Sequence, residues 1–211
     1  MTAPTWVGVK VKVQSALAAA ETITAITKAN PGVVSCSSPP ADGSYVLLKV
    51  DGMTQVNNRV FRTANAGAGD FELEGEDTSL YDTFVDGTFE VVTLDTNLKT
   101  LVDFQASGGE TNYLDDTTIH DLQEIERPGL ASPFRITSTS KFDPSDPALK
   151  ALEAAHAVQA ERVVMVEFRD GKRFLINGFI SFPFTPGGNA REIATTPLGI
   201  AAQGRPTVYA T

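Results

Sequence analysis

Residues 134–141 read FRITSTSK, followed by FDPSDPALKALEAAH at 142–156, RVVMVEF at 162–168 and RFLINGFISF at 173–182. The first segment alternates between two kinds of side chain, which is the period of a strand with two different faces. In the second segment Asp146 suits a helix N-cap, and Pro147 suits the first helical position because the N–H that proline lacks has no partner there. The sequence therefore predicts a strand over 134–141 and a helix over 147–158.

The next two segments predict a β-hairpin, because two strand-like runs flank the turn signal Asp170-Gly171. A last long strand is expected at about 191–203, before the short ending PTVY at 206–209. If these strands form one sheet, its edges must be paired, covered or charged.

An early strand is predicted at 6–13, WVGVKVKV, in which the four valines share one face and Gly8, Lys10 and Lys12 lie on the other. We expect this strand to join the same sheet and to take part in a sheet shared between subunits. The residues assigned to that shared sheet are Val7, Val9, Val11 and Val13.

The order of strand, FDPSDPALKAL helix (142–152), hairpin, GFISFPFT (178–185), strand and GRPTV (204–208) resembles the major tail tube protein of long-tailed, siphophage-like bacteriophages over about residues 95–209. The resemblance implies a mainly β fold: a β-sandwich or half-barrel with one flanking α-helix, packed onto the sheet through Leu149 and Leu152. It also implies a structural virion protein of the tail, made in the host cytoplasm.

The same resemblance implies assembly into hexameric rings, stacked into a hollow tube through which DNA passes without specific binding. The implied partners are further copies of the chain and the tape-measure, tail-terminator and tail-tip proteins. No membrane partner and no cofactor are implied.

Residues 22–93 differ from the rest of the chain in their sequence pattern. Short strand signals alternate there with turn clusters such as ANPG (29–32) and SPPADG (38–43). ITAITKANPGVV (23–34), GMTQVNNRVFRT (52–63), FELEG (71–75) and SLYDTFVDGT (79–88) are similar to a small β-barrel-like module seen in many phage virion proteins. We therefore expect a tail tube domain made of 1–21 and 94–211, with an inserted small β module at 22–93. The module is expected to decorate the outside of the tube.

Residues 95–118, DTNLKTLVDFQASGGETNYLDDTT, are predicted to form a long polar loop with Gly108-Gly109 at its tip. Structureless stretches of this length are usually functional or disordered. IHDLQEIE (119–126) is expected to resume as strand or short helix until Arg127-Pro128-Gly129 ends it. In tail tube proteins a long loop bridges successive rings, so the resemblance implies a stacking role for Asp103, Gln105, Gly108, Gly109, Glu110, Tyr113, Asp115 and Asp116.

The charge of the chain is acidic, with 17 Lys and Arg against 26 Asp and Glu, a net charge of −9. An acidic protein does not attract a phosphate backbone, which disfavours a DNA packager or sequence reader. An acidic wall would instead let DNA pass without sticking. No apolar run approaches the roughly 18–20 residues of a membrane span.

Reactive chemistry is sparse. His120 and His156 are the chain's imidazoles, and no GxSxG elbow occurs. The single cysteine, Cys36, lies in VSCSS without a basic neighbour that would lower its pKa, so a small buried residue is expected. Neither the Asp115-Asp116 pair nor Asp143 with Asp146 has the spacing of a calcium loop. We expect no enzyme and no catalytic, metal or cofactor-binding residue.

Two alternatives of other kinds stay open. One is a β-sandwich binding or adhesion module of a tail or cell surface, and the other is the tube protein of a contractile injection system.

Overall fold

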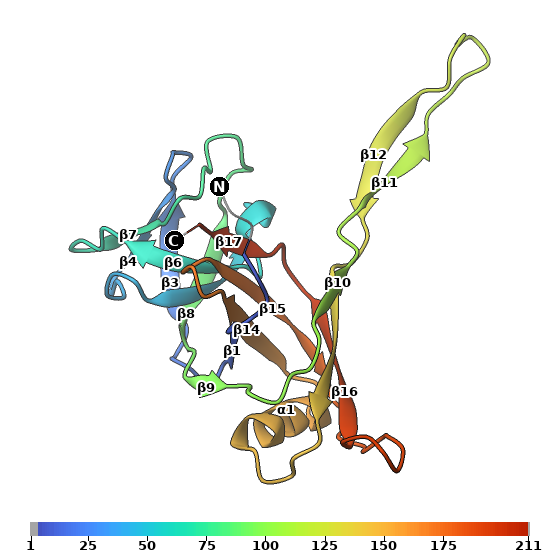
Figure 1. Ribbon diagram of the computed structural model, residues 1–211. Coiled ribbons are helices and arrows are strands. Elements are labelled where there is room, and N and C mark those ends of the chain that lie inside the picture. Colours follow the sequence, from blue (N-terminus) through green and yellow to red (C-terminus); the bar gives the residue numbers. More distant parts are fainter. Residues whose placement is uncertain (1–3, 211) are drawn as a thin grey trace.

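The structure is a computed structural model that describes residues 4–210. It is mainly β, with a flanking α-helix, as predicted (Figure 1). In the described residues eight antiparallel strands form a large curved sheet. Their order across the sheet is β10 (Gln105–Ser107), β13 (Arg135–Lys141), β16 (Thr195–Ala202), β15 (Arg173–Ser181), β14 (Glu161–Glu167), β1 (Lys10–Val13) and β9 (Thr96–Asn97), with β17 (Thr207–Tyr209) beside β15.

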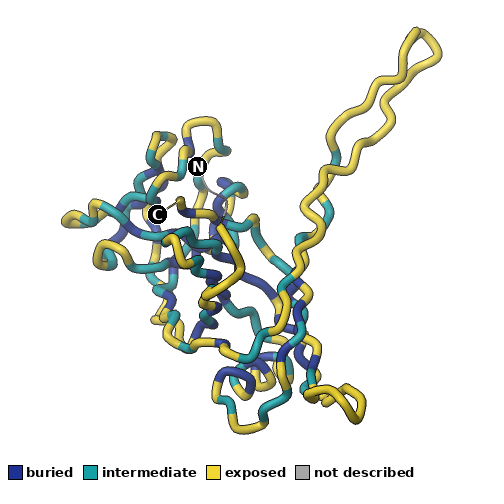
Figure 2. Tube along the Cα trace, viewed as in Figure 1, coloured by how far each residue is buried: buried dark blue, intermediate teal, exposed yellow. Residues whose placement is uncertain are grey.

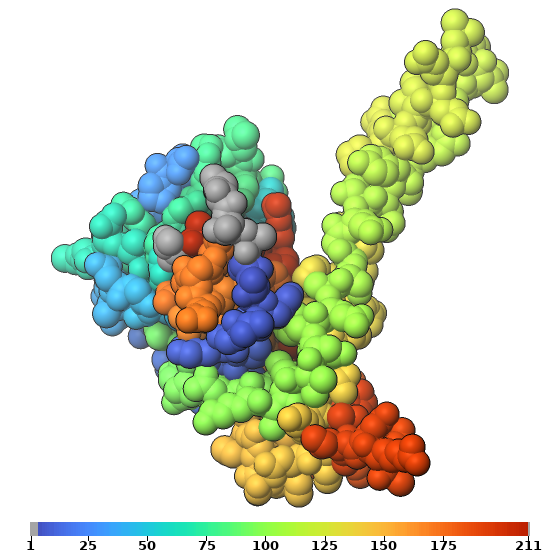
Figure 3. Space-filling model, in the orientation of Figure 1, coloured from blue at the N-terminus to red at the C-terminus, as the bar shows by residue number. Residues whose placement is uncertain are grey.

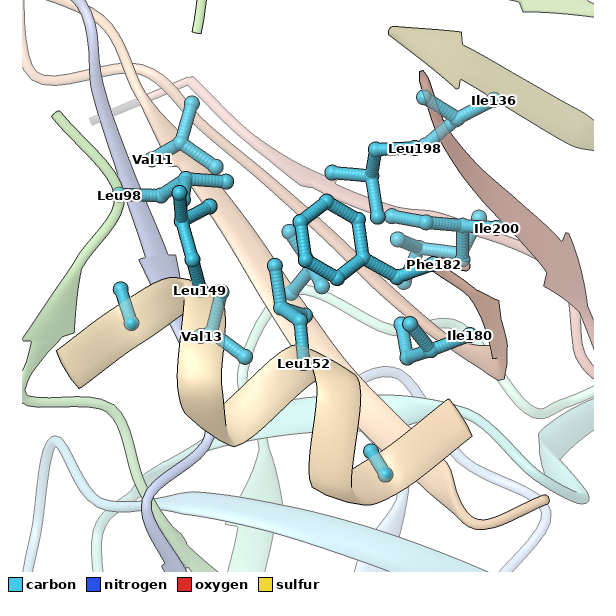
Figure 4. Packing of buried hydrophobic residues seen from close by; sticks show 14 of the residues in the cluster. Val11, Val13, Leu98, Ile136, Leu149, Leu152, Ile180, Phe182, Leu198 and Ile200 are labelled. Atoms are coloured by element: carbon cyan, nitrogen blue, oxygen red, sulfur yellow. The ribbon is translucent and has the colours of Figure 1, made fainter. Parts of the chain in front are cut away.

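Helix α1 (Pro147–Ala157) begins as the sequence predicts, because the Asp146 carboxylate accepts a hydrogen bond from the N–H of Ala148 at 2.8 Å. Leu149 and Leu152 are fully buried and point from the helix into the core of the large sheet (Figure 4). That core also contains Val11, Val13, Leu98, Ile136, Val164, Val166, Ile176, Ile180, Phe182, Leu198 and Ile200.

The N-terminal strand is shorter than the sequence predicts. It starts at Lys10 because Gly8 adopts φ +78°, a left-handed conformation that interrupts an extended run. Val11 and Val13 are buried in the chain's own core, whereas Val7 lies before the strand and is 75% exposed. The prediction that four valines share one face is therefore wrong for Val7.

Residues 16–93 form a second sheet that closes on itself. Its elements are β2 (Ala16–Leu17), β3 (Glu21–Ile26), β4 (Val33–Cys36), β5 (Tyr45–Asp51), the 3-10 turn η1 (Thr54–Val56), β6 (Val60–Ala64), β7 (Asp70–Leu73) and β8 (Asp86–Thr93). The path runs β8-β3-β4-β7-β6-β5, and β5 pairs again with β8 from Tyr45 opposite Val92 to Asp51 opposite Asp86. Closure leaves these six strands without a free edge, and β2 extends the path on one side of β8.

The interior of this small barrel is aromatic and aliphatic, with Phe71 and Phe89 packed edge to face at 5.3 Å. One ion pair is also buried: Arg59 reaches both carboxylate oxygens of Glu76 and donates to the Gln55 carbonyl. Its guanidinium also lies over the Phe61 ring, 4.6 Å from the ring centre.

The barrel and α1 cover opposite faces of β14. Val164 and Val166 point toward the helix side, while the alternate residues Val163 and Met165 pack against barrel residues. The barrel supplies Leu47, Val60 and Val92 to this contact, and the C-terminal strand supplies Tyr209. Strand β14 is consequently buried on both sides.

Tyr209 ties the C-terminus to the barrel. Its hydroxyl accepts a hydrogen bond from the Arg62 N–H at 2.7 Å, and the Arg62 guanidinium lies 5.0 Å from the ring centre. Burial raises the pKa of Tyr209 to about 12.

A pKa raised by folding predicts a loss of stability at alkaline pH. The folded state holds the Tyr209 proton more tightly than the unfolded chain, so this contribution is complete below about pH 10 and is lost as pH rises toward 12. Between pH 9 and 11 the free energy of unfolding should fall by about 1.4 kcal/mol more in the native protein than in Tyr209→Phe. Urea unfolding of both proteins at the two pH values measures this difference, and equal losses would contradict it.

Candidate assembly surfaces

The most prominent surface feature is a hairpin arm, residues 108–133, that projects from the large sheet (Figure 1). It contains β11 (Thr111–Asp115) and β12 (Glu126–Ala131), paired antiparallel. The arm is exposed along its length (Figure 2). The expectation of a structureless loop over 95–118 is wrong, because this stretch contains β9, β10 and β11.

The rest of the arm also differs from the sequence prediction. Residues 119–125 form the turn at its end, and Arg127-Pro128-Gly129 lies inside β12 instead of ending an element. Pro128 is tolerated opposite Tyr113 because a two-stranded ribbon has a free edge on each side, where the missing N–H leaves no broken bond.

Gly108 and Gly109 lie at the base of the arm and not at its tip. Both adopt φ +82°, and a Cβ on Gly108 would lie 2.1 Å from the Pro133 carbonyl oxygen. These two glycines therefore form the joint at which β10 gives way to β11.

The tip of the arm is held by local hydrogen bonds. The Asp121 carboxylate accepts from the N–H and the hydroxyl of Thr118, both at 2.7 Å, and the Asp116 N–H donates to the Ile125 carbonyl at 2.8 Å. Ile119 and Leu122 are presented outward from this turn, at 96% and 102% exposed.

The arm combines apolar and acidic side chains. Six large apolar residues on it are exposed, namely Tyr113, Leu114, Ile119, Leu122, Ile125 and Leu130. Residues 110–131 carry six carboxylates and one arginine, a balance of −5. Hydrogen bonds from Thr118 lower the pKa of Asp121 from its ordinary value.

The large sheet also has short free edges at both ends of its strand order. Among residues 4–210, β10 and β9 at these ends have a partner strand on one side alone, and so does β17 beside β15. Between β10 and β9, β13 and β16 bury one face and leave the alternate residues Arg135, Thr137, Lys141 and Pro197 exposed. The chain thus offers an arm, three open strand edges and an uncovered sheet face for contacts with other molecules.

The sequence model of the family described as phage tail tube protein, TTP, matches residues 51–211, which is 161 of the chain's 211 residues. The chain belongs to this family. The match begins at the last residue of β5, so it takes in β6 to β8 of the small barrel together with α1 and most of the large sheet. No curated protein sequence matches the chain.

A structural comparison finds a chain from the tail of an empty GTA particle, determined by helical refinement with C6 symmetry. The two share 15% sequence identity at a TM-score of 0.42, over 54% of this chain and 85% of that chain.

The residues assigned to a stacking loop in this tail tube protein fall into two groups. Gly108, Gly109, Glu110, Tyr113, Asp115 and Asp116 lie on the arm. Asp103 and Gln105 lie before it, where the Asp103 carboxylate accepts from the Thr139 N–H and Gln105 pairs with Thr137. Asp103 thus binds strand β13 of its own chain. The tip residues Ile119 and Leu122 were not predicted as site residues. The signal that could have found them is two apolar residues in an otherwise polar stretch, TTIHDLQE, at 117–124.

Of the four valines assigned to a shared sheet, Val13 does not lie on a free edge, and Val7 and Val9 precede β1. Over Lys12 and Val13, β1 is paired on both sides, with β14 and with β9. A part for Val7, Val9, Val11 and Val13 in a contact between subunits stays a prediction.

The potentially reactive side chains of the tail tube protein are dispersed. His120 lies in the exposed arm tip, and His156 lies in the last turn of α1 with Nδ1 3.4 Å from the Ile180 carbonyl oxygen. Burial raises the pKa of the Cys36 thiol, the opposite of what a nucleophile requires. Across residues 4–210 no group of three or more His, Cys, Asp or Glu is placed to hold a metal ion. No helix in that range is long and apolar enough to cross a membrane.

Proposed function

We propose that this tail tube protein polymerises as hexameric rings, which stack into the hollow phage tail tube through which DNA is delivered. The observation that carries the proposal is the arm, which exposes six large apolar side chains without burying them in its own chain. Exposed apolar residues gathered on one surface usually mark a contact with another molecule. On the arm they are available to a neighbouring ring.

Ring closure is proposed to use the free edges of the large sheet. An unpaired edge is a ready template for another strand, and a ring of subunits joined edge to edge leaves none open. In this scheme β10 of one subunit faces the β9 side of the next. The number six comes from the resemblance to the tail tube family.

The channel is proposed to be lined by β13 and β16. Strand β14 is covered by α1 on one face and by the small barrel on the other, so it is not available to line a channel. The exposed face of β13 and β16 carries Arg135, Thr137, Lys141 and Pro197. This face is not acidic, so an electrostatically repulsive wall would have to draw its carboxylates from other elements, such as the arm.

The division into a tube domain of 1–21 and 94–211 and an inserted module of 22–93 is retained as a proposal. It is supported by the closed strand path of the barrel. The barrel packs on the same face of the sheet as the exposed residues of β13 and β16, but at the other end of the strand order, over β14 and the part of β15 beside β17. A position outside the tube is therefore retained for this module as a proposal and requires that the channel wall end before β14. The proposed partners remain the tape-measure, tail-terminator and tail-tip proteins, and the proposed location is the virion tail.

Negative-stain electron microscopy of the purified protein tests this function. At low concentration we expect single subunits, and at high concentration hollow tubes built from six-fold rings. Subunits that stay separate at every concentration, and also when tail-tip proteins are added as an initiator, would contradict the proposal.

A further inference from the structure

An apolar groove lies at the base of the arm. It has a volume of about 290 Å³, and its walls include Trp6, Phe104, Ala106, Phe168, Phe174 and Val208. Trp6 and Val208 are 56% and 68% exposed, so the groove opens to solvent. The β14–β15 turn and the N-terminal residues lie side by side on this part of the surface (Figure 3, orange and dark blue).

The end of the sheet that carries this groove is basic in an otherwise acidic chain. Lys172 and Arg173 lie at the groove. β1 and residues 167–173 together carry Lys10, Lys12, Arg169, Lys172 and Arg173 against Glu167 and Asp170, a balance of +3. Asp170 pairs with Lys172 at 2.6 Å, and Glu167 lies 3.2 Å from both Lys12 and Arg173. Basic charge therefore remains in excess after these pairs.

The tip of the arm has the complementary chemistry. Ile119 and Leu122 project from its turn, and Asp121 and Glu124 lie beside them. A cavity of roughly 150 Å³ holds a benzene molecule, so the groove has space for two branched aliphatic side chains. The arm carries a net charge of −5, whereas β1 together with residues 167–173, which we call the groove end, carries a net charge of +3.

The tip does not reach the groove of its own chain. Phe104 and Ala106, at the foot of the arm, are part of the groove wall. At about 3.3 Å per strand residue the tip at Ile119 lies roughly 45 Å from Gln105. An arm tip that occupies this groove must therefore belong to a second copy of the chain.

We propose that the arm tip of one subunit docks Ile119 and Leu122 into this groove on a subunit of the neighbouring ring. The inference rests on the proposed ring stacking and names the surface that receives the arm. Apolar burial holds the contact, while Asp121 and Glu124 orient the tip toward Lys172 and Arg169. Because exposed charges are screened by salt, we expect association to slow as ionic strength rises.

Cysteine cross-linking tests the docking site directly. The double variant Gln123→Cys with Val208→Cys, and a second with Ala106→Cys in place of Val208→Cys, keep Ile119 and Leu122 and are assembled and treated with a short bis-maleimide. All three positions are exposed, so folding is not at risk, and the native Cys36 is buried. The matched control pairs Gln123→Cys with Leu80→Cys; Leu80 is 94% exposed on the barrel side of the chain.

We expect ladders of cross-linked subunits from the two groove pairs, at yields about tenfold above the Leu80 control. Tubes without groove cross-links would overturn the docking site and leave the proposed function standing. Groove cross-links without tubes would overturn the proposed function and leave the docking site standing. If neither tubes nor groove cross-links appear, the proposed function and the docking site are both overturned.

Discussion

Excision of residues 111–131 is expected to abolish tube formation and to leave the folded subunit intact. The Ser132 N–H donates to the Glu110 carbonyl at 2.7 Å, so two glycines can join Glu110 to Ser132 without moving the sheet. All of the removed residues except Asp121 and Gly129 are exposed, and none belongs to a core cluster. Electron microscopy should show no tubes at about ten times the concentration at which the native protein assembles.

The melting temperature is the control for this excision. It should stay within about 2 °C of the native value, because surface changes away from packed features usually alter stability by less than about 0.5 kcal/mol. Leu80→Ser, a change at an equally exposed apolar residue outside the arm, should leave assembly unchanged. Normal tubes from the excised protein would show that the arm is not needed for stacking.

Leu152→Ala is expected to be strongly destabilising, by about 2–5 kcal/mol. Leu152 is fully buried between α1 and the large sheet, and truncation leaves a cavity among Val13, Phe182 and their neighbours (Figure 4). A domain of ordinary stability has about 5–15 kcal/mol in total, so this loss is a large fraction of it. Denaturant unfolding measures the difference.

Leu122→Ala makes the same chemical change at an exposed site and serves as the matched control. Its free energy of unfolding should stay within about 0.5 kcal/mol of the native value, while its assembly should weaken. Comparing the two substitutions thus distinguishes the contribution of a leucine to core packing from its contribution to association between subunits. Equal stabilities for Leu152→Ala and Leu122→Ala would mean that α1 does not pack as described.

The charge pattern suggests how premature assembly is limited. Two arms at −5 each repel one another, whereas an arm and a groove end at +3 attract. Self-association through arm-to-arm contact of the apolar residues is therefore opposed, and the orientation needed for stacking is favoured. Assembly that becomes faster at high salt would contradict this account.

The sequence alone determined the elements whose signals are local. The Asp146-Pro147 start of α1, the strand at 134–141 and the hairpin around Asp170-Gly171 were predictable because capping, alternation and turn chemistry depend on neighbouring residues. Packing of the helix through Leu149 and Leu152 was expected from the resemblance to the tail tube family. The order of these elements was enough to identify the tail tube family.

The tertiary structure decided what local signals leave open. Residues 95–118 are largely polar, so the sequence predicts a loop there, and pairing between β11 and β12 makes β11 one strand of an arm. The valine pattern at 6–13 was read as one strand, and the positive φ of Gly8 shortened it. The apolar groove brings together residues 4–6, 104–106, 166–174 and 208, which no spacing in the sequence relates. Strand pairing and grooves depend on residues far apart in the chain, and for that reason the fold alone places the arm and the groove that we propose receives it.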